Sequence, residues 1–181
     1  MTLRTGWRRA AAFASLLLLS VLPVGAQTWD SILSTIRKRF PTVRQLSTRE
    51  LSGWMEDAGR PAKPLLLDVR AAREFGVSHL PGARHATSLE AIRPLLSSNS
   101  QPIVVYCSVG YRSSALAEKL QKAGITNLYH LDGSIFAWAN EGRPVCQGSK
   151  ILTPALVHPY DEKWGQLLKP ELRATPGPRS R

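Results

Sequence analysis

Residues 102–124 read PIVVYCSVGYRSSALAEKLQKAG, an apolar run that ends in a cysteine and is followed by a short loop and a long amphipathic segment. The apolar run is typical of a buried strand, and RSSALAEKLQKAG predicts a helix that ends at Gly124. Cys107 therefore lies between the carboxyl end of a strand and the amino end of a helix. In parallel sheets this is the edge where ligands bind.

Similar apolar runs flank this stretch, and segments with helical spacing separate them. Further buried strands are expected at PLLLDVR and NLYHL, and short strands at GARHA and VRQL. Helices are expected at STREL, where Ser47 and Glu50 have capping-box spacing, and at AAREFG, SLEAIRPLLSS (interrupted by Pro94) and GSIFAWANEG. This alternation predicts an α/β domain with a central, largely parallel sheet flanked by helices.

The residues that follow Cys107 suit an anionic sulfur. A thiol is a good nucleophile only as its thiolate, which the N–H groups of a helix N-terminus favour. Gly110 lets the loop curl so that successive N–H groups point inward as an anion-binding nest. Arg112 adds a positive charge at the rim, and the hydroxyl of Ser113 is expected to satisfy an N–H group of the first helical turn. The alternative is that Cys107 is a small buried core residue.

Four motifs, in order from Arg44 to Val145, resemble the rhodanese-type sulfurtransferase family. CSVGYRS is similar to the active loop C-x-x-G-x-R-S, and LLLDVR is similar to the D-V-R strand end. SHLPGA is similar to G-H-I-P-G-A, with Ser78 in place of glycine. LDGSIFAWANEGRPV is similar to L-x-G-G-x-x-x-W-x-x-x-G-x-P-V, with Ser134 in place of the second glycine.

The resemblance implies a rhodanese-like three-layer domain that acts as a sulfurtransferase without a metal or an organic cofactor. Cys107 would accept a sulfane sulfur from thiosulfate or a persulfide and pass it to a thiol or cyanide. Since Arg112 is the only cation of the loop, we do not expect a strong preference for thiosulfate. The substrate-binding residues implied by the resemblance are Ser108, Val109, Gly110, Tyr111 and Arg112.

Two other functions stay open at this point. A partner-specific sulfur carrier could hold a persulfide in the same nest with little turnover. A phosphatase or arsenate reductase would use a C-x5-R loop, but the arginine position counted from Cys107 is Ser113. The shorter loop favours sulfur chemistry.

Two charged residues and a histidine outside the loop have structural interpretations. Asp68 and Arg70 end the D-V-R strand, and we expect a structural ion pair there, between Arg70 and Glu74. We expect His79 to fix a turn by hydrogen bonding and not to act as a base.

Neither the remaining cysteine nor the remaining histidines indicate a second site. We interpret Cys146 as structural, with a disulfide to Cys107 as the alternative. Trp138 is expected in the core. No metal-ligand spacing connects the other histidines, which are His85, His130 and His158.

The N-terminus predicts an export signal. Residues 1–26 combine three arginines, an apolar stretch and small residues before Gln27, as a signal peptide does. We therefore expect a periplasmic protein, or alternatively one anchored by its N-terminus. Three parts are expected in the mature chain: an amphipathic helix in residues 27–42, the rhodanese-like domain in 43–147 and an extension in 148–181. The helix is expected to pack on the domain or, alternatively, to meet a membrane surface. The last stretch, RATPGPRSR, is expected to be disordered.

The charge of the chain is basic but dispersed. Lys and Arg number 24 against 13 Asp and Glu, which gives a formal net charge of +11. Because these cations form no long run, the charge indicates a solvated surface and not a nucleic-acid partner. The expected partners are a small sulfur donor and a thiol acceptor, either a small molecule or a protein. The expected state is a monomer without a transmembrane span in the mature chain.

Overall fold

Five short strands form the central sheet of the computed structural model, which describes residues 28–96 and 101–175. The strand order is β1-β5-β4-β2-β3, and every neighbouring pair is parallel. The strands are β1 (Gln45–Leu46), β2 (Leu65–Asp68), β3 (Arg84–His85), β4 (Ile103–Tyr106) and β5 (Leu128–Leu131). Each lies within a segment for which the sequence predicts a strand, and the expected parallel sheet is confirmed.

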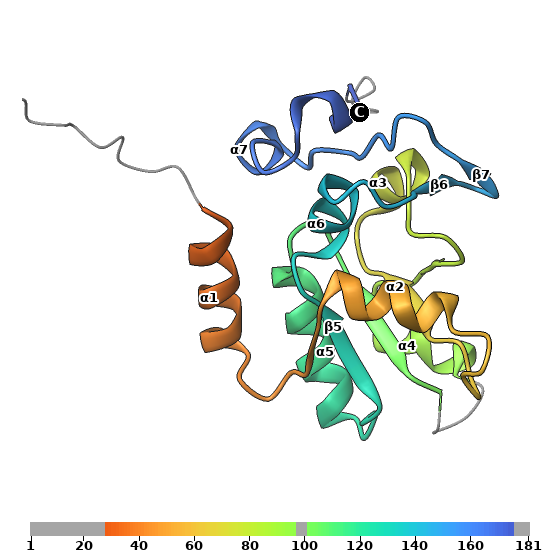
Figure 1. Ribbon diagram of the computed structural model, residues 1–181. Coiled ribbons are helices and arrows are strands. Elements are labelled where there is room, and N and C mark those ends of the chain that lie inside the picture. The colour runs from red at the N-terminus through yellow and green to blue at the C-terminus, as the bar shows by residue number, and fades with distance from the viewer. Residues whose placement is uncertain (1–27, 97–100, 176–181) are drawn as a thin grey trace, which may run out of the picture.

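Helices cover both faces of this sheet (Figure 1). α2 and α6 contact each other on one face, and α5 packs on β4 and β5 from the other. The helices of the domain are α2 (Thr48–Glu56), α3 (Ala72–Val77), α4 (Leu89–Ile92), the 3-10 turn η1 (Arg93–Leu95), α5 (Tyr111–Lys122) and α6 (Ser134–Asn140). The predicted three-layer α/β fold is therefore confirmed.

Local sequence explains why these elements begin and end where they do. All four residues of β2 and of β4 are buried, as expected for central strands covered on both faces. α2 begins at the predicted capping box, in which the Glu50 N–H donates to Ser47 Oγ and the Ser47 N–H donates to Glu50 Oε2. α4 gives way to η1 where Pro94 removes a helical N–H donor.

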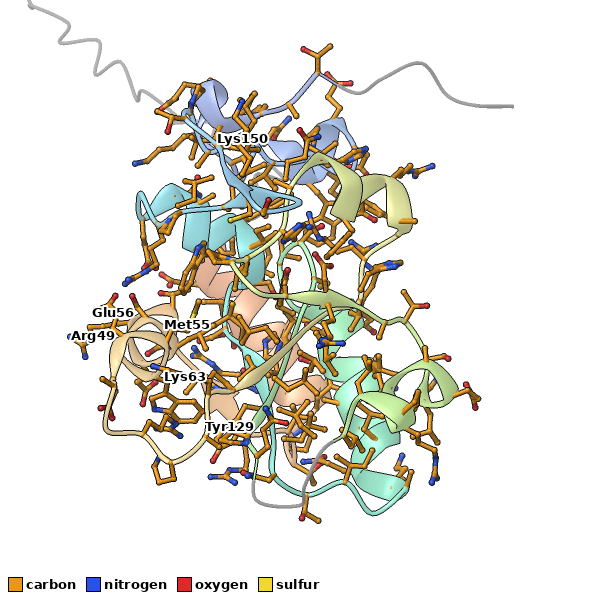
Figure 2. The ribbon with its side chains drawn as sticks, turned by 90° about the vertical axis from the view of Figure 1, so that its right-hand side faces the viewer. Arg49, Met55, Glu56, Lys63, Tyr129 and Lys150 are labelled. Carbon is orange, nitrogen blue, oxygen red and sulfur yellow. The ribbon has the colours of Figure 1, made fainter. Side chains whose placement is uncertain are left out.

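The carboxyl end of α2 is held by a lysine from the following loop (Figure 2). Lys63 Nζ donates to the carbonyl oxygens of Met55, at 2.7 Å, and of Asp57, at 2.8 Å. A cation at this position satisfies helix-terminal carbonyl groups and interacts favourably with the helix dipole. The contact fixes the loop that leads into β2.

The carboxyl ends of β2, β4 and β5 meet at one edge of the sheet. Asp68 is in register with Tyr106, so Cys107 begins the loop next to the end of β2. Val105 is in register with His130, which places the end of β5 on the other side of Cys107. This is the edge that parallel α/β sheets use for ligands.

Helix α1 (Trp29–Arg39) packs on the domain beside α5 (Figure 1). Ile36 and Phe40 are buried in the same core as the sheet. Arg37 forms an ion pair with Asp132, which follows β5. The apolar face of this amphipathic helix is thus covered by the domain and does not face a membrane surface.

The C-terminal extension also folds onto the domain. It contains an antiparallel hairpin, a helix and a 3-10 turn, and Val157 and Leu168 are buried in the core. The Val157 N–H donates to Leu172 O at 2.8 Å, and the Ala174 N–H donates to Val157 O at 3.0 Å. The expectation of disorder from Arg173 onward was wrong for residues 173–175, because main-chain hydrogen bonds to Val157 hold this segment on the domain. The elements are β6 (Cys146–Gln147), β7 (Lys150–Ile151), α7 (Glu162–Gly165) and η2 (Pro170–Leu172).

The predicted signal peptide, residues 1–26, and residues 176–181 lie outside the described residues. In the part of the chain that is described, no helix has the length and apolar character needed to cross a membrane.

A buried ion pair joins Asp68 to Arg70. Arg70 Nη2 lies 2.6 Å from Asp68 Oδ2, and both side chains are fully buried. The same nitrogen donates to Ser78 O at 2.5 Å, and the Arg70 N–H donates to Asp68 Oδ1 at 3.0 Å. The expected structural ion pair therefore exists, but its acid is Asp68. Pairing of Arg70 with Glu74 was wrong, because Glu74 is engaged by a second arginine described below.

We expect Asp68→Ala to lower the free energy of unfolding by about 3–5 kcal/mol, because it leaves the Arg70 guanidinium buried without its carboxylate. Urea unfolding measures this loss. Lys122→Ala is the matched control, since it removes an exposed i,i+4 pair with Glu118 and should cost about 0.5 kcal/mol or less. Equal losses in the two variants would contradict the structural role of the buried pair.

Candidate active site

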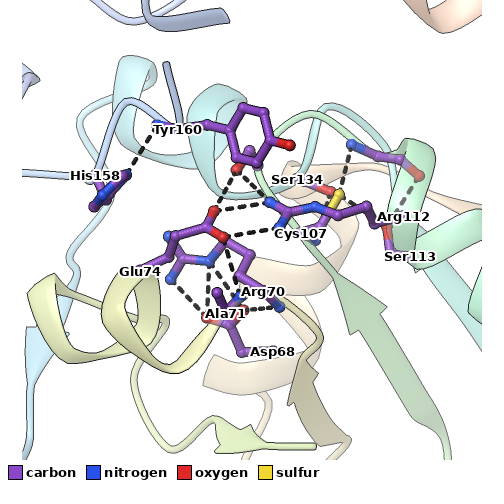
Figure 3. Close-up of polar contacts among 12 residues, drawn as sticks. Asp68, Arg70, Ala71, Glu74, Cys107, Arg112, Ser113, Ser134, His158 and Tyr160 are labelled. Carbon is purple, nitrogen blue, oxygen red and sulfur yellow. Dashed lines mark hydrogen bonds and ion pairs between the residues drawn. The ribbon is translucent and has the colours of Figure 1, made fainter. Parts of the chain in front are cut away.

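Cys107 lies at the carboxyl end of β4, directly before the loop that leads into α5 (Figure 3). The residue is buried, and its Sγ accepts a hydrogen bond from the Gly110 N–H at 3.2 Å. Both Cys107 and Cys146 are free thiols, so the alternative of a disulfide between them is not present. A backbone N–H directed at Sγ is suited to stabilising negative charge on sulfur.

Gly110 allows the loop to close in this way. Its φ is +125°, a value that side chains disfavour, and a Cβ placed there would lie 2.7 Å from the His130 ring. The predicted need for glycine at this position therefore has two physical causes: the backbone conformation and the closeness of His130. A larger residue would push the loop away from the end of β5.

The start of α6 holds the loop from the opposite side. Ile135 N–H donates to Cys107 O at 3.2 Å, and Phe136 N–H donates to Ser108 O at 3.1 Å. The Cys107 N–H donates to Ser134 Oγ, also at 3.2 Å. Ser134 has a positive φ of 52°, where the related motif has glycine. Sequence reasoning treated this serine only as a departure from the motif, whereas its hydroxyl positions the backbone of Cys107.

Ser113 lies behind the sulfur. Its Oγ is 3.6 Å from Cys107 Sγ, 3.0 Å from Gly110 O and 3.0 Å from His130 Nδ1. Burial, with a smaller effect from the Arg37 charge, lowers the pKa of His130 to about 3, so its ring is neutral near pH 7. The expectation that the Ser113 hydroxyl satisfies an N–H group of the first helical turn was wrong, because this hydroxyl connects the loop to His130 instead.

Arg112 is bound to Glu74 by two hydrogen bonds. Its Nη1 and Nη2 each donate to one Glu74 carboxylate oxygen at 2.8 Å, and Nη2 also contacts Ser108 Oγ at 2.9 Å. Burial alone would raise the pKa of Glu74, but the hydrogen bonds and charge of Arg112 outweigh it and lower that pKa from 4.5 to about 2. The charge that the sequence places at the rim is therefore compensated by a buried carboxylate.

The other predicted supporting residues lie beneath or beside this loop. Asp68 and Arg70 form the buried pair below Glu74 (Figure 3). His79 Nδ1 is 3.0 Å from Leu80 O and its ring stacks on another aromatic ring, which agrees with a turn-fixing role. Trp138 is buried in the core, as predicted.

A pocket of about 180 Å³ opens above Cys107. Four of the predicted substrate-binding residues line it, while Gly110 supplies the N–H group that contacts the sulfur. Two further aromatic residues come from the C-terminal extension, which sequence reasoning did not assign to the site. Their only sequence signal is that they are isolated aromatics in the stretch HPYDEKWG. The lining residues are Cys107, Ser108, Val109, Tyr111, Arg112, Tyr160 and Trp164.

No group of three or more His, Cys, Asp or Glu side chains within residues 28–96 and 101–175 is arranged to hold a metal ion. The chemistry that the site itself offers is that of a thiol placed under a backbone N–H group and open to a small pocket. Such a thiol can act as a nucleophile toward a sulfur atom.

Comparison with known proteins gives relatives that share this domain. The probable adenylyltransferase/sulfurtransferase MoeZ of Mycobacterium tuberculosis is 35% identical over 104 residues, which are 55% of this chain and 25% of that protein. An uncharacterized protein of Synechocystis is 32% identical over 82 residues, which are 44% of this chain and 45% of that protein. The matches thus span less than half the length of either relative.

Solved structures share the fold. The thiosulfate sulfurtransferase from Pseudomonas aeruginosa matches with a TM-score of 0.56 and 20% identity, over 66% of this chain and 23% of that one. A protein from Bacillus halodurans matches with a TM-score of 0.53 and 19% identity, over 74% of this chain and 96% of that one. The family model of the rhodanese-like domain matches residues 47–141, more than half of the chain. The chain belongs to the rhodanese-like domain family.

Proposed function

We propose that this protein is a sulfurtransferase that carries sulfane sulfur on Cys107. The observation that carries the proposal is the Gly110 N–H group, which lies 3.2 Å from Cys107 Sγ at the base of a pocket of about 180 Å³. A buried structural cysteine needs neither the directed N–H group nor the opening. The sulfurtransferase name of the Mycobacterium tuberculosis relative supports the same class of reaction.

The reaction has two steps. The Cys107 thiolate attacks the terminal sulfur of a donor, a new S–S bond forms, and the bond between that sulfur and the rest of the donor breaks with its electron pair. With thiosulfate, the products are the Cys107 persulfide and sulfite. An acceptor thiolate or cyanide then attacks the outer sulfur and releases the Cys107 thiolate. A covalent intermediate of this kind predicts ping-pong kinetics.

The position of Arg112 argues against phosphatase or arsenate reductase chemistry. Such an enzyme needs an arginine free to bind a tetrahedral oxyanion. Both terminal nitrogens of Arg112 are instead bound to Glu74 at 2.8 Å. The loop is also one residue shorter than C-x5-R, since Ser113 occupies that position.

A sulfur carrier with little turnover would use the same nest, and the difference lies in the second step. A carrier would be loaded by a donor but would release its sulfur only to one partner. A sulfurtransferase would release it to cyanide or to small thiols as well.

We expect the protein from Gln27 onward to gain the mass of one sulfur atom when it is incubated with thiosulfate or a small persulfide. Intact-mass spectrometry measures the gain, and cyanide should remove it. Cys107→Ser should abolish the gain entirely, because serine cannot hold a persulfide. Cys146→Ser should retain it and is the matched control. Absence of any gain in protein with a free Cys107 thiol would sink the proposal, and a gain that cyanide and small thiols cannot remove would indicate a carrier.

The Glu74–Arg112 pair predicts a specific loss of stability in acid. The folded protein keeps Glu74 ionised down to about pH 2, while the unfolded chain binds its proton near 4.5. The carboxylate therefore stabilises the fold above pH 5, and this contribution disappears as the pH falls to about 2. Allowing for partial solvent screening, we expect the ionised Glu74 carboxylate to contribute about 2–3 kcal/mol to the free energy of unfolding at pH 7.

Glu74→Gln should lose this stability at pH 7 and should show a flatter decline between pH 5 and 2 in urea unfolding. Glu171→Gln is the control, since it removes an exposed carboxylate of η2 and should keep the acid decline of the unmodified protein. An unchanged decline in Glu74→Gln would show that the pair does not stabilise the fold.

We also propose that the protein works in the periplasm after removal of residues 1–26. The basic start and the apolar stretch of the sequence support this location. We expect the protein recovered from the periplasmic fraction to begin at Gln27, as measured by intact mass. Recovery of the uncut chain from the membrane fraction would favour the anchored alternative.

A further inference from the structure

The pocket above Cys107 is completed by a segment that lies beyond the matched domain. The family model ends at residue 141, and Tyr160 and Trp164 lie in the extension that follows. We propose that these two residues make the pocket selective for sulfur donors that have an apolar body and no more than one negative charge. The inference rests on the proposed sulfurtransferase function and names its substrate class.

The extension is fastened firmly enough to act as a fixed wall. Asn140, the last residue of α6, donates from Nδ2 to Leu167 O at 2.7 Å and accepts the Lys169 N–H at 2.9 Å. Val157 and Leu168 of the extension are themselves buried in the core. These contacts place the extension over the carboxyl edge of the sheet, close to α6 (Figure 1).

Tyr160 is held in a strained conformation at this place. Its φ is +68°, which costs energy for a residue that is not glycine. The Tyr160 N–H donates to His158 Nδ1 at 2.9 Å, and Asp161 begins α7 by accepting the Trp164 N–H at 2.8 Å. A strained residue held from both sides and directed at a pocket is typical of a functional position.

The charge of the pocket is nearly balanced. Among the described residues that line it, Arg112 is the one with a charged side chain. Its guanidinium is bound by Glu74, and its carbon Cζ lies 4.8 Å from the centre of the Tyr160 ring (Figure 3). Since the Glu74 carboxylate neutralises this cation and the Tyr160 ring lies beside it, a dianion entering the pocket would lose water while meeting little net positive charge.

The walls of the pocket are apolar and aromatic. Val109 comes from the loop and Tyr111 from the start of α5, and Tyr160 and Trp164 belong to the extension. Tyr111 is fixed by an edge contact with Phe40, with 5.3 Å between the ring centres. These surfaces can bury an apolar group attached to the reacting sulfur, and burial of such a group in the transition state raises kcat/KM.

A second hollow of about 100 Å³ extends this wall. Tyr111 and Trp164 line both hollows, and side chains of α1 form the far side of the second one. The second hollow therefore lies next to the pocket above Cys107, with Tyr111 and Trp164 common to both. The α1 residues are Ser31, Ile32, Thr35 and Ile36.

Three anionic donors separate the effects of charge and body. They are thiosulfate, the methanethiosulfonate anion and the benzenethiosulfonate anion. Each transfers its terminal sulfur to the Cys107 thiolate and leaves as sulfite, methanesulfinate or benzenesulfinate, so the bonds that form and break are the same. Thiosulfate and methanethiosulfonate differ by one charge, whereas methanethiosulfonate and benzenethiosulfonate differ only in the body.

The assay uses cyanide as the acceptor and measures the thiocyanate formed. We expect kcat/KM for the donor to be higher for methanethiosulfonate than for thiosulfate, and about tenfold higher again for benzenethiosulfonate. Each value is divided by the rate of the same donor with a small free thiol, which removes differences in intrinsic reactivity. Tyr160→Ala and Trp164→Ala should each lower the ratio of benzenethiosulfonate to methanethiosulfonate about tenfold.

Conservative variants and a matched control keep the test independent of folding. Tyr160→Phe and Trp164→Phe retain an aromatic wall and should retain most of the ratio. Ile151→Ala removes an exposed apolar side chain of the same extension that does not line the pocket, and it should leave the ratio unchanged.

The two possible failures are distinguishable. Suppose that sulfur loads on Cys107 but the corrected ratio of benzenethiosulfonate to methanethiosulfonate stays near one, or is the same in the alanine variants as in the unmodified protein. The inference is then overturned, and the sulfurtransferase function stands. Thiosulfate used as well as the monoanions would also overturn it. If no donor loads Cys107 by intact mass, the proposed function itself is overturned, and the inference with it.

Discussion

The Glu74 carboxylate joins the start of its own helix, α3, to the loop and helix that follow Cys107, 34 to 38 residues further along the chain. It accepts the Ala71 N–H at the start of α3, the Ser108 hydroxyl of the loop and two N–H groups of Arg112 on α5. A buried carboxylate is stabilising only when such partners replace the water that it loses. Because all these partners converge on Glu74, the fold of α3, the shape of the loop and the charge of the pocket depend on one another. A change in any of them leaves a buried charge without its full set of bonds.

The sulfur is positioned by hydrogen bonds on both sides of the loop. Gly110 approaches Cys107 Sγ from the α5 side, while Ser134 binds the Cys107 N–H from the α6 side. His130 restricts the space beneath Gly110 and keeps Ser113 behind the sulfur. The surroundings of the sulfur are thus built from rigid elements that belong to the sheet and its covering helices. Such preorganisation favours charge that develops on sulfur, since no reorganisation accompanies the reaction.

Local patterns in the sequence were sufficient for the sheet and for the loop. An apolar run such as PIVVYC has few alternatives to a central parallel strand. Gly110, between Cys107 and the next helix, predicts a tightly curled loop, because glycine adopts backbone conformations that other residues disfavour. Interactions between distant segments were not accessible in the same way. A charge at a strand end was expected to pair locally, Arg70 with Glu74, yet Arg112, 38 residues away, forms the pair with Glu74. Tyr160 and Trp164 have no periodic relation to the loop, so only the folded extension reveals that they line the pocket.

The basic charge of the chain and the balanced charge of the pocket act at different stages. The chain stays basic without the three arginines of residues 1–26, and its positive charge attracts every anionic donor to the surface, a dianion more strongly than a monoanion, as long as salt does not screen it. That attraction raises encounter rates without distinguishing what the sulfur is attached to. The proposed discrimination therefore belongs to the pocket, where Glu74 neutralises Arg112 and the aromatic wall is available to the body of the donor. An extension that supplies only two side chains can in this way alter the substrate class of a domain whose catalytic loop it leaves intact.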